Sequence, residues 1–277
     1  MLKTTVKVAA ASLLTGAAMT ASVASAADYQ LTDVQKREVV ALLTAPKASP
    51  GIGIGVPTGF GASSGTIFAS IGGTTTDNDN TDDLDGSATI GMGFGDANKA
   101  LALEVQANII SLTNNADGSN VGEEGSISVK LSRNIGSSSA ISVGAENITT
   151  WGEATGDDLD ASGYIAFTNL QALSDNPSNP LTLGLTIGAG SQRFAYADSN
   201  AFGVFGAISL AVHRQVGLIA DHNGKYANVG VSLVPFLSLP LTVSLSAINV
   251  NEVSAGKGGT STGETEFGGS LGYSWNF

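Results

Sequence analysis

The chain has 277 residues, and 12 Lys and Arg against 24 Asp and Glu give it a formal net charge of −12. This acidic balance argues against nucleic acid as a partner, because phosphate contacts need clusters of Lys and Arg. Cysteine is absent, which excludes disulfides, thiol catalysis and thiolate metal sites. The apolar content of 42% is ordinary, so the composition does not indicate a disordered chain.

Residues 1–26 have the layout of a cleaved signal peptide. Lys3 and Lys7 supply a basic start, residues 8–14 form a short apolar core, and residues 24–26 supply the small side chains that a signal peptidase reads. The apolar core is too short to cross a bilayer as a helix, which needs about 20 apolar residues. We therefore expect export and cleavage after Ala26.

Residues 27–62 are expected to form a separate N-terminal segment. Within 27–49, Thr32 and Gln35 resemble a capping box, and Pro46 would end the helix. Two interpretations remain for this part: a short periplasmic arm, or a helix that enters the barrel and plugs it. Residues 50–59, Pro-Gly-Ile-Gly-Ile-Gly-Val-Pro-Thr-Gly, are expected to be a glycine-rich connector to the first strand.

From about residue 63 the apolar pattern changes to a period of two, which is typical of half-buried strands. Leu101, Leu103 and Val105 alternate with Ala102, Glu104 and Gln106. Each such run has the length that a tilted strand needs to cross a bilayer. About twelve runs are predicted, near 64–73, 86–95, 99–111, 125–133, 139–149, 161–169, 181–190, 202–212, 214–221, 225–234, 239–249 and 265–277.

The connections between these runs alternate in length. Those after odd-numbered runs are mostly long and polar, namely 74–84, 114–124, 151–160, 192–200 and 251–264. Those after even-numbered runs are mostly short, although 170–180 is long for a turn and 221–224 is short for a loop. This alternation predicts an up-and-down barrel with both termini in the periplasm and the long loops outside.

The placement of charge favours a membrane barrel over a soluble sandwich. Charged residues gather in the expected loops, and within the strands Glu104, Lys130 and Glu146 all fall on the polar face. A Lys or Arg facing lipid at the middle of the membrane costs about 2–4 kcal/mol. The apolar faces avoid this cost, as a membrane would require.

The last run ends in alternating aromatic residues, Tyr273, Trp275 and Phe277. This pattern resembles the closing strand of Gram-negative outer-membrane β-barrel proteins of the porin-like class, and the resemblance covers residues 63–277 without matching a specific family. The resemblance implies that these three residues form the signal read by the barrel-assembly machinery. It also implies outer-membrane lipids and lipopolysaccharide as partners.

The polar strand faces supply the candidate functional residues. Glu104, Gln106, Asn108, Lys130 and Glu146 are predicted to point into the lumen. They would line a narrow aqueous path, or form a sealed interior in which Lys130 pairs with one of the carboxylates. Twelve strands lie between the about 8 that leave a filled interior and the 16–18 that leave an open channel.

The leading hypothesis is therefore a small porin-like passive channel for small polar or cationic solutes, without a cofactor. The acidic outer loops would concentrate cations at its mouth. The alternative is a closed structural or surface-interaction barrel that uses its long acidic loops for contact. The pattern leaves the oligomeric state open.

Catalytic and metal sites find little support in the sequence. The two histidines, His213 and His222, fall in or beside expected turns, and no enzyme activity is predicted. An acidic run superficially resembles a calcium loop but lacks the glycine that an EF-hand needs at its sixth position. At most it would bind a divalent cation weakly, through Asp77, Asp79, Asp82 and Asp83.

Overall fold

The computed structural model describes residues 47–78, 81–110, 112, 122–152, 160–174, 176, 181–195, 202–252 and 264–277, without the side chains of 76–85. The predicted signal peptide and residues 27–46 lie outside this part, so their assignments stay predictions. Among the described residues, no helix combines the length and the apolar character needed to span a membrane.

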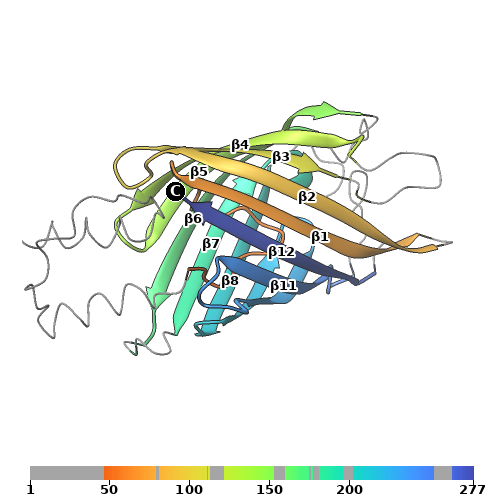
Figure 1. Ribbon diagram of the computed structural model, residues 1–277. Coiled ribbons are helices and arrows are strands. Elements are labelled where there is room, and N and C mark those ends of the chain that lie inside the picture. Colours follow the sequence, from red (N-terminus) through yellow and green to blue (C-terminus); the bar gives the residue numbers. More distant parts are fainter. Residues whose placement is uncertain are drawn as a thin grey trace, which may run out of the picture. The chain divides into compact units, whose positions relative to one another are not determined.

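The described residues form one closed antiparallel barrel of twelve strands, in which each strand pairs with its neighbours along the chain and β1 pairs with β12 (Figure 1). This confirms the predicted fold class. The strands are β1 (Thr66–Asn78), β2 (Thr81–Gly95), β3 (Ala102–Ile109), β4 (Gly125–Ile135), β5 (Ser139–Trp151), β6 (Ser162–Ala172), β7 (Thr182–Gly190), β8 (Gly203–His213), β9 (Val216–His222), β10 (Ala227–Leu233), β11 (Leu241–Ile248) and β12 (Glu266–Asn276).

One predicted loop is wrong. Residues 74–84 were expected as a long polar connection, but β1 and β2 continue their pairing through Asn78 and Thr81. Three consecutive threonines, 74–76, explain the extension, because β-branched residues favour strands even when they are polar. The resulting hairpin reaches beyond the neighbouring strands at the end of the barrel opposite the start of β1 (Figure 1). We call this the loop end, and the other end the turn end.

The outer wall of the barrel is apolar. Every strand carries at least one large apolar side chain that is exposed on the outside, for example Ile187 at 61% and Ile90 at 59%. Many of the inward side chains are small and polar instead, and Ser126, Ser142 and Thr168 are almost fully buried. A soluble sheet protein buries its large apolar residues, so this reversed arrangement is the one that a lipid environment stabilises.

Four inward or rim aromatic rings lie across glycines of the adjacent strand. They form the registered pairs Phe68–Gly91, Trp151–Gly125, Tyr164–Gly144 and Phe205–Gly188. A Cβ atom at any of these glycines would overlap the facing ring. The glycines are therefore needed for close approach, and each ring covers a stretch of strand that has no side chain of its own.

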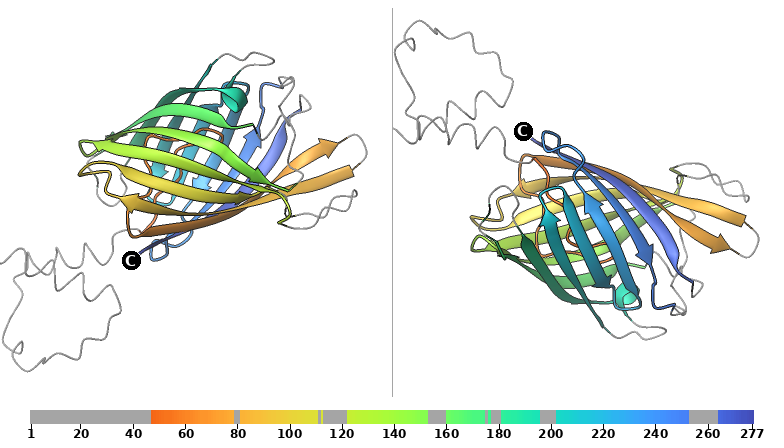
Figure 2. Two further views of the ribbon diagram at one scale, coloured as in Figure 1. Left: turned by 90° about the horizontal axis from the view of Figure 1, so that it is seen from above. Right: turned by 90° about the horizontal axis from the view of Figure 1, so that it is seen from below.

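The interior is occupied in part by residues 47–65, which we call the lumen segment. It enters at the turn end, where the Lys47 amide donates to the Leu237 carbonyl at 3.1 Å, and it returns to the same end to start β1. Figure 2 shows this orange trace inside the ring of strands. The glycine-rich stretch is thus more than the connector that the sequence suggested, because it runs through the interior of the barrel.

The last strand closes the barrel with the predicted alternation. Tyr273 and Trp275 lie on its outer face with ring centroids 4.5 Å apart, and Trp275 is 51% exposed. Phe277 is 82% exposed. An aromatic pair on the outer face near the end of an apolar wall is typical of a membrane interface.

Candidate functional site: the lumen segment and the barrel wall

The apex of the lumen segment is held by one carboxylate. The amides of Ile54 and Gly55 both donate to Oδ2 of Asp221 on β9, at 2.6 and 2.9 Å. Lower on the same limb, the Gly51 amide donates to Oγ of Ser232 on β10 at 2.8 Å. Two successive N–H groups aimed at one carboxylate form a strong, charge-assisted anchor.

A polar network supports Asp221 from behind. Asn228 donates to Asp221 Oδ1 at 2.7 Å, and the Asn228 side-chain oxygen accepts from the Asn249 amide at 3.1 Å. The short β9–β10 turn closes above it, with the Asn223 side chain accepting from two backbone amides of the turn. Burial raises the pKa of the Tyr226 phenol in that turn.

The returning limb crosses to the opposite wall. Ser142 donates to the Thr58 carbonyl at 2.9 Å, and the Gly59 amide donates to Thr168 Oγ1 at 2.8 Å. Gly59 permits this approach, because a Cβ there would overlap the Ala140 carbonyl. The lumen segment is thus hydrogen bonded to walls on both sides of the barrel.

Glu104 and Lys130 hold the end of this limb. They face each other across β3 and β4, and Lys130 Nζ lies 3.2 Å from Glu104 Oε1. Lys130 also donates to the Phe60 carbonyl at 3.1 Å, and Glu104 Oε2 accepts from the Ala62 amide at 2.8 Å. Lys130 therefore pairs with a carboxylate, and both charges of the pair bind the lumen segment.

Glu146 forms the second interior ion pair, with Arg193. The Arg193 guanidinium donates to both carboxylate oxygens of Glu146, and its Nη1 donates to the Gly55 carbonyl at 3.1 Å. A β-bulge next to Glu146 gives Asn147 a positive φ of 54°, and its amide donates to Ser128. Beyond this bulge the alternation reverses, since Ile148 is exposed on the outside.

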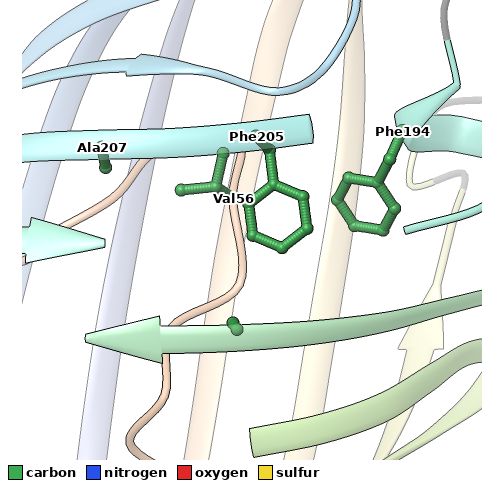
Figure 3. Packing of buried hydrophobic residues seen from close by; sticks show 5 residues of the cluster. Val56, Phe194, Phe205 and Ala207 are labelled. Carbon is green, nitrogen blue, oxygen red and sulfur yellow. The ribbon is translucent and has the colours of Figure 1, made fainter. Parts of the chain in front are cut away.

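A small apolar cluster lies beside the apex. Phe194, from a short 3-10 turn after β7, packs against Phe205 of β8 with centroids 4.7 Å apart (Figure 3). Val56 of the lumen segment and Ala207 complete the contact, and Tyr164 meets both rings edge-on. Arg193 and Phe194 thus fix the connection after β7 to the lumen segment by charge and by packing.

Gln106 and Asn108 also face the interior. Asn108 bridges three strands: it accepts from Thr89 at 2.9 Å and donates to Ser126 and Ser128 at 3.2 Å. Gln106 lines a hollow next to the lumen segment. The structure therefore places all five candidate residues on the inner wall, although four of them bind other parts of the protein.

Two hollows flank the lumen segment. The first, of about 330 Å³, is lined by both ion pairs together with Gln106, Ser128, Tyr164 and residues 54–57. The second, of about 340 Å³, lies against the other wall and is lined by residues 53 and 54 and by uncharged residues of β1, β2, β11 and β12. The first hollow is thus lined by charged side chains, whereas the described residues that line the second are uncharged.

The two histidines stabilise turns. His213 Nδ1 accepts from the Gln215 amide at 3.2 Å, and His222 Nδ1 accepts from the Gly224 amide at 3.1 Å. Among the residues that the structure describes, no group of three His, Asp or Glu could hold a metal ion. Asp79 and the side chains of Asp77, Asp82 and Asp83 lie outside that part, so weak cation binding there stays a prediction.

Sequence reasoning missed Arg193 and Asp221 as interior residues. It assigned Arg193 to a polar loop and Asp221 to a hairpin turn. A local signal existed for the lumen segment: glycines at 51, 53 and 55 alternate with apolar residues, and regularly spaced glycines indicate close backbone approach. Nothing nearby in the sequence indicated which wall the segment contacts.

The closed antiparallel wall, apolar outside and polar inside, defines a transmembrane β-barrel. No protein-family model matches the chain, and comparison with curated proteins gives no significant relative. Among solved structures, the chain is similar to the outer membrane protein Omp33 of Acinetobacter baumannii, with a TM-score of 0.44 and 10% identity over 76% of this chain and 98% of that one. It is also similar to OprB of Pseudomonas putida in its low-pH structure, with a TM-score of 0.26 and 10% identity over 76% and 91% of the two chains.

Proposed function

We propose that the protein is a narrow porin-like channel of the bacterial outer membrane that passes small polar solutes passively. The observation that carries this proposal is the pair of polar hollows beside the lumen segment inside an apolar wall. A barrel that served only as a scaffold would gain stability by filling these spaces with side chains. Export, assembly through the C-terminal strand, and contact with lipid and lipopolysaccharide are part of the proposal.

The lumen segment supports a constricted path rather than a wide pore. It is hydrogen bonded to β5, β6, β9 and β10, and it lies near the middle of the cross-section. Solutes would therefore pass around a fixed obstacle. We expect passage only of molecules much smaller than those that cross an open barrel of this size. The acidic loops would concentrate small cations at the mouth, so we also propose that small cations pass alongside neutral solutes.

Planar bilayers containing the purified protein test the proposed function. We expect small, regular conductance steps from the full chain. A variant without residues 47–61 should give clearly larger steps, because the obstacle is gone. If the wild-type protein shows no conductance while the deletion variant conducts, the channel hypothesis is wrong and the closed barrel is favoured.

The closed structural or surface-interaction barrel remains the second candidate, because the same contacts of the lumen segment also favour a sealed interior. Its function would then depend on the outer loops. Loop deletions that leave permeability unchanged but abolish adhesion to a surface would support it.

A further inference from the structure

We infer that solute crosses the barrel along its uncharged side, between the lumen segment and the wall formed by β1, β2, β11 and β12, and that the favoured solutes are small and uncharged. This inference rests on the proposed channel function and names its path and solute class. It differs from the sequence-based expectation, in which Glu104, Lys130 and Glu146 line the path.

The interior charges of β3, β4, β5 and β9, and of Arg193 after β7, are already engaged. Glu104 and Lys130 bind each other and the returning limb. Glu146 binds Arg193, which in turn binds the apex, and Asp221 accepts two amides of that apex. A charge in the interior is costly unless it is paired, so these groups hold the lumen segment in place and are poorly available to a passing ion.

The wall formed by β1, β2, β11 and β12 has a different composition. Among the described inward side chains of these four strands, Glu266 at the loop end is the one charged group. The second hollow lies against this wall and is lined by hydroxyls and bare backbone from Gly72, Gly73, Thr74, Ser87, Ser244, Ser246, Gly268, Gly269 and Ser270, together with Ile248.

This lining fits small neutral polar molecules. Serine and threonine hydroxyls both donate and accept hydrogen bonds, so they can replace the hydration of a solute hydroxyl or amide. They carry no fixed charge that would attract one ion and repel the other. The small side chains also keep the hollow wide, and its volume of about 340 Å³ falls at the small-molecule end of protein binding sites.

The natural absence of cysteine allows a direct test in the full-length protein. Single cysteines are placed at Ser246 on the uncharged wall and, as the matched control, at Gln106 in the charged hollow. Each variant is treated with a bulky methanethiosulfonate reagent in a planar bilayer. Modification of Ser246→Cys should roughly halve the conductance or reduce it further, while modification of Gln106→Cys should leave it nearly unchanged.

A second pair of variants tests selectivity. Ser246→Asp and Ser246→Lys should shift the reversal potential in opposite directions under a salt gradient. Gln106→Glu should shift it little. In liposome swelling assays with the wild-type protein, the swelling rate should fall as the size of the neutral solute increases.

The failures of the two proposals can be told apart. Wild-type protein without conductance defeats the channel function itself. If the wild-type protein conducts, two results would overturn the assigned path. In the first, the reagent blocks the Gln106→Cys variant as strongly as the Ser246→Cys variant. In the second, Ser246→Asp leaves the reversal potential unchanged.

Discussion

Asp221 and Gly55 are separated by 166 positions in the sequence, yet the Gly55 amide donates to the Asp221 carboxylate at 2.9 Å. This bond, with its neighbour from Ile54, fixes the apex of the lumen segment to one wall, while Arg193 binds the carbonyl of the same Gly55 from the other side. The apex is thus clamped between an anion that accepts its amides and a cation that donates to its carbonyl. The conductance of the barrel should depend on this clamp.

Replacing Asp221 should loosen the clamp from the β9 side. Asp221→Ala removes the acceptor of two apex amides and of Asn228, and hydrogen bonds to a charged group contribute about 1.5–3 kcal/mol each. We expect larger and noisier conductance steps, together with a lower temperature for unfolding on heat-modifiability gels. Asp96→Asn, in an exposed turn where Asp96 pairs with Lys99, is the control and should behave as wild type. Unchanged, quiet steps in Asp221→Ala would show that the anchor does not restrain the segment.

The contributions of Arg193 and Glu146 to the free energy of unfolding should be strongly coupled. Arg193→Gln leaves Glu146 without its partner and removes a donor to Gly55. We expect a loss of about 1–3 kcal/mol of stability, below the range for a fully buried pair because both side chains are partly exposed. A double-mutant cycle with Glu146→Gln, followed by urea unfolding in detergent, measures the coupling. If the two substitutions lowered the free energy of unfolding additively, this would contradict a direct interaction between the two side chains.

Gly144 should be needed for the position of the Tyr164 ring. The registered pair brings the ring over this glycine, and an added methyl group would overlap the phenol. Gly144→Ala should therefore destabilise the barrel by about 1–3 kcal/mol, as overpacking does, and Tyr164→Ala should remove most of that penalty. Gly163→Ala is a neighbouring control, since its new methyl would meet only the Ser191 hydroxyl, at 3.9 Å. Equal losses in the two glycine variants would refute the role of the ring.

The sequence was sufficient to predict the barrel wall, because apolar and polar residues alternate along each strand and so distinguish its two faces. The predicted runs agree with the strands to within a few residues, except where Thr74–Thr76 extend the first hairpin. The reversal of faces at Asn147 was not predictable, because a bulge depends on pairing with β4. The inward direction of Glu104 and Lys130 followed from the pattern, but their bonds to the lumen segment did not.

The lumen segment itself escaped prediction for a physical reason. Most of its bonds join backbone amides and carbonyls to side chains distant in the sequence, such as Ser232 and Thr168. Backbone groups carry no sequence signal, so their partners cannot be read from composition or spacing. The inward direction of Arg193 could not be predicted either, because no local sequence pattern distinguishes an inward arginine in a polar connection from an exposed one.

The position of the lumen segment is the central claim, and one disulfide tests it most directly. A Cβ built on Gly51 lies 3.6 Å from the Cβ of Ser232, within the range of about 3.5–4.5 Å that disulfides adopt. The variant Gly51→Cys, Ser232→Cys should therefore oxidise almost completely in the folded barrel and run as a cross-linked band on an unfolded, non-reducing gel. Gly51→Cys combined with Ser87→Cys, on the β2 wall, should stay reduced. Free thiols at both positions of the first pair after oxidation, or equal cross-linking in the control, would contradict a lumen segment fixed to β10.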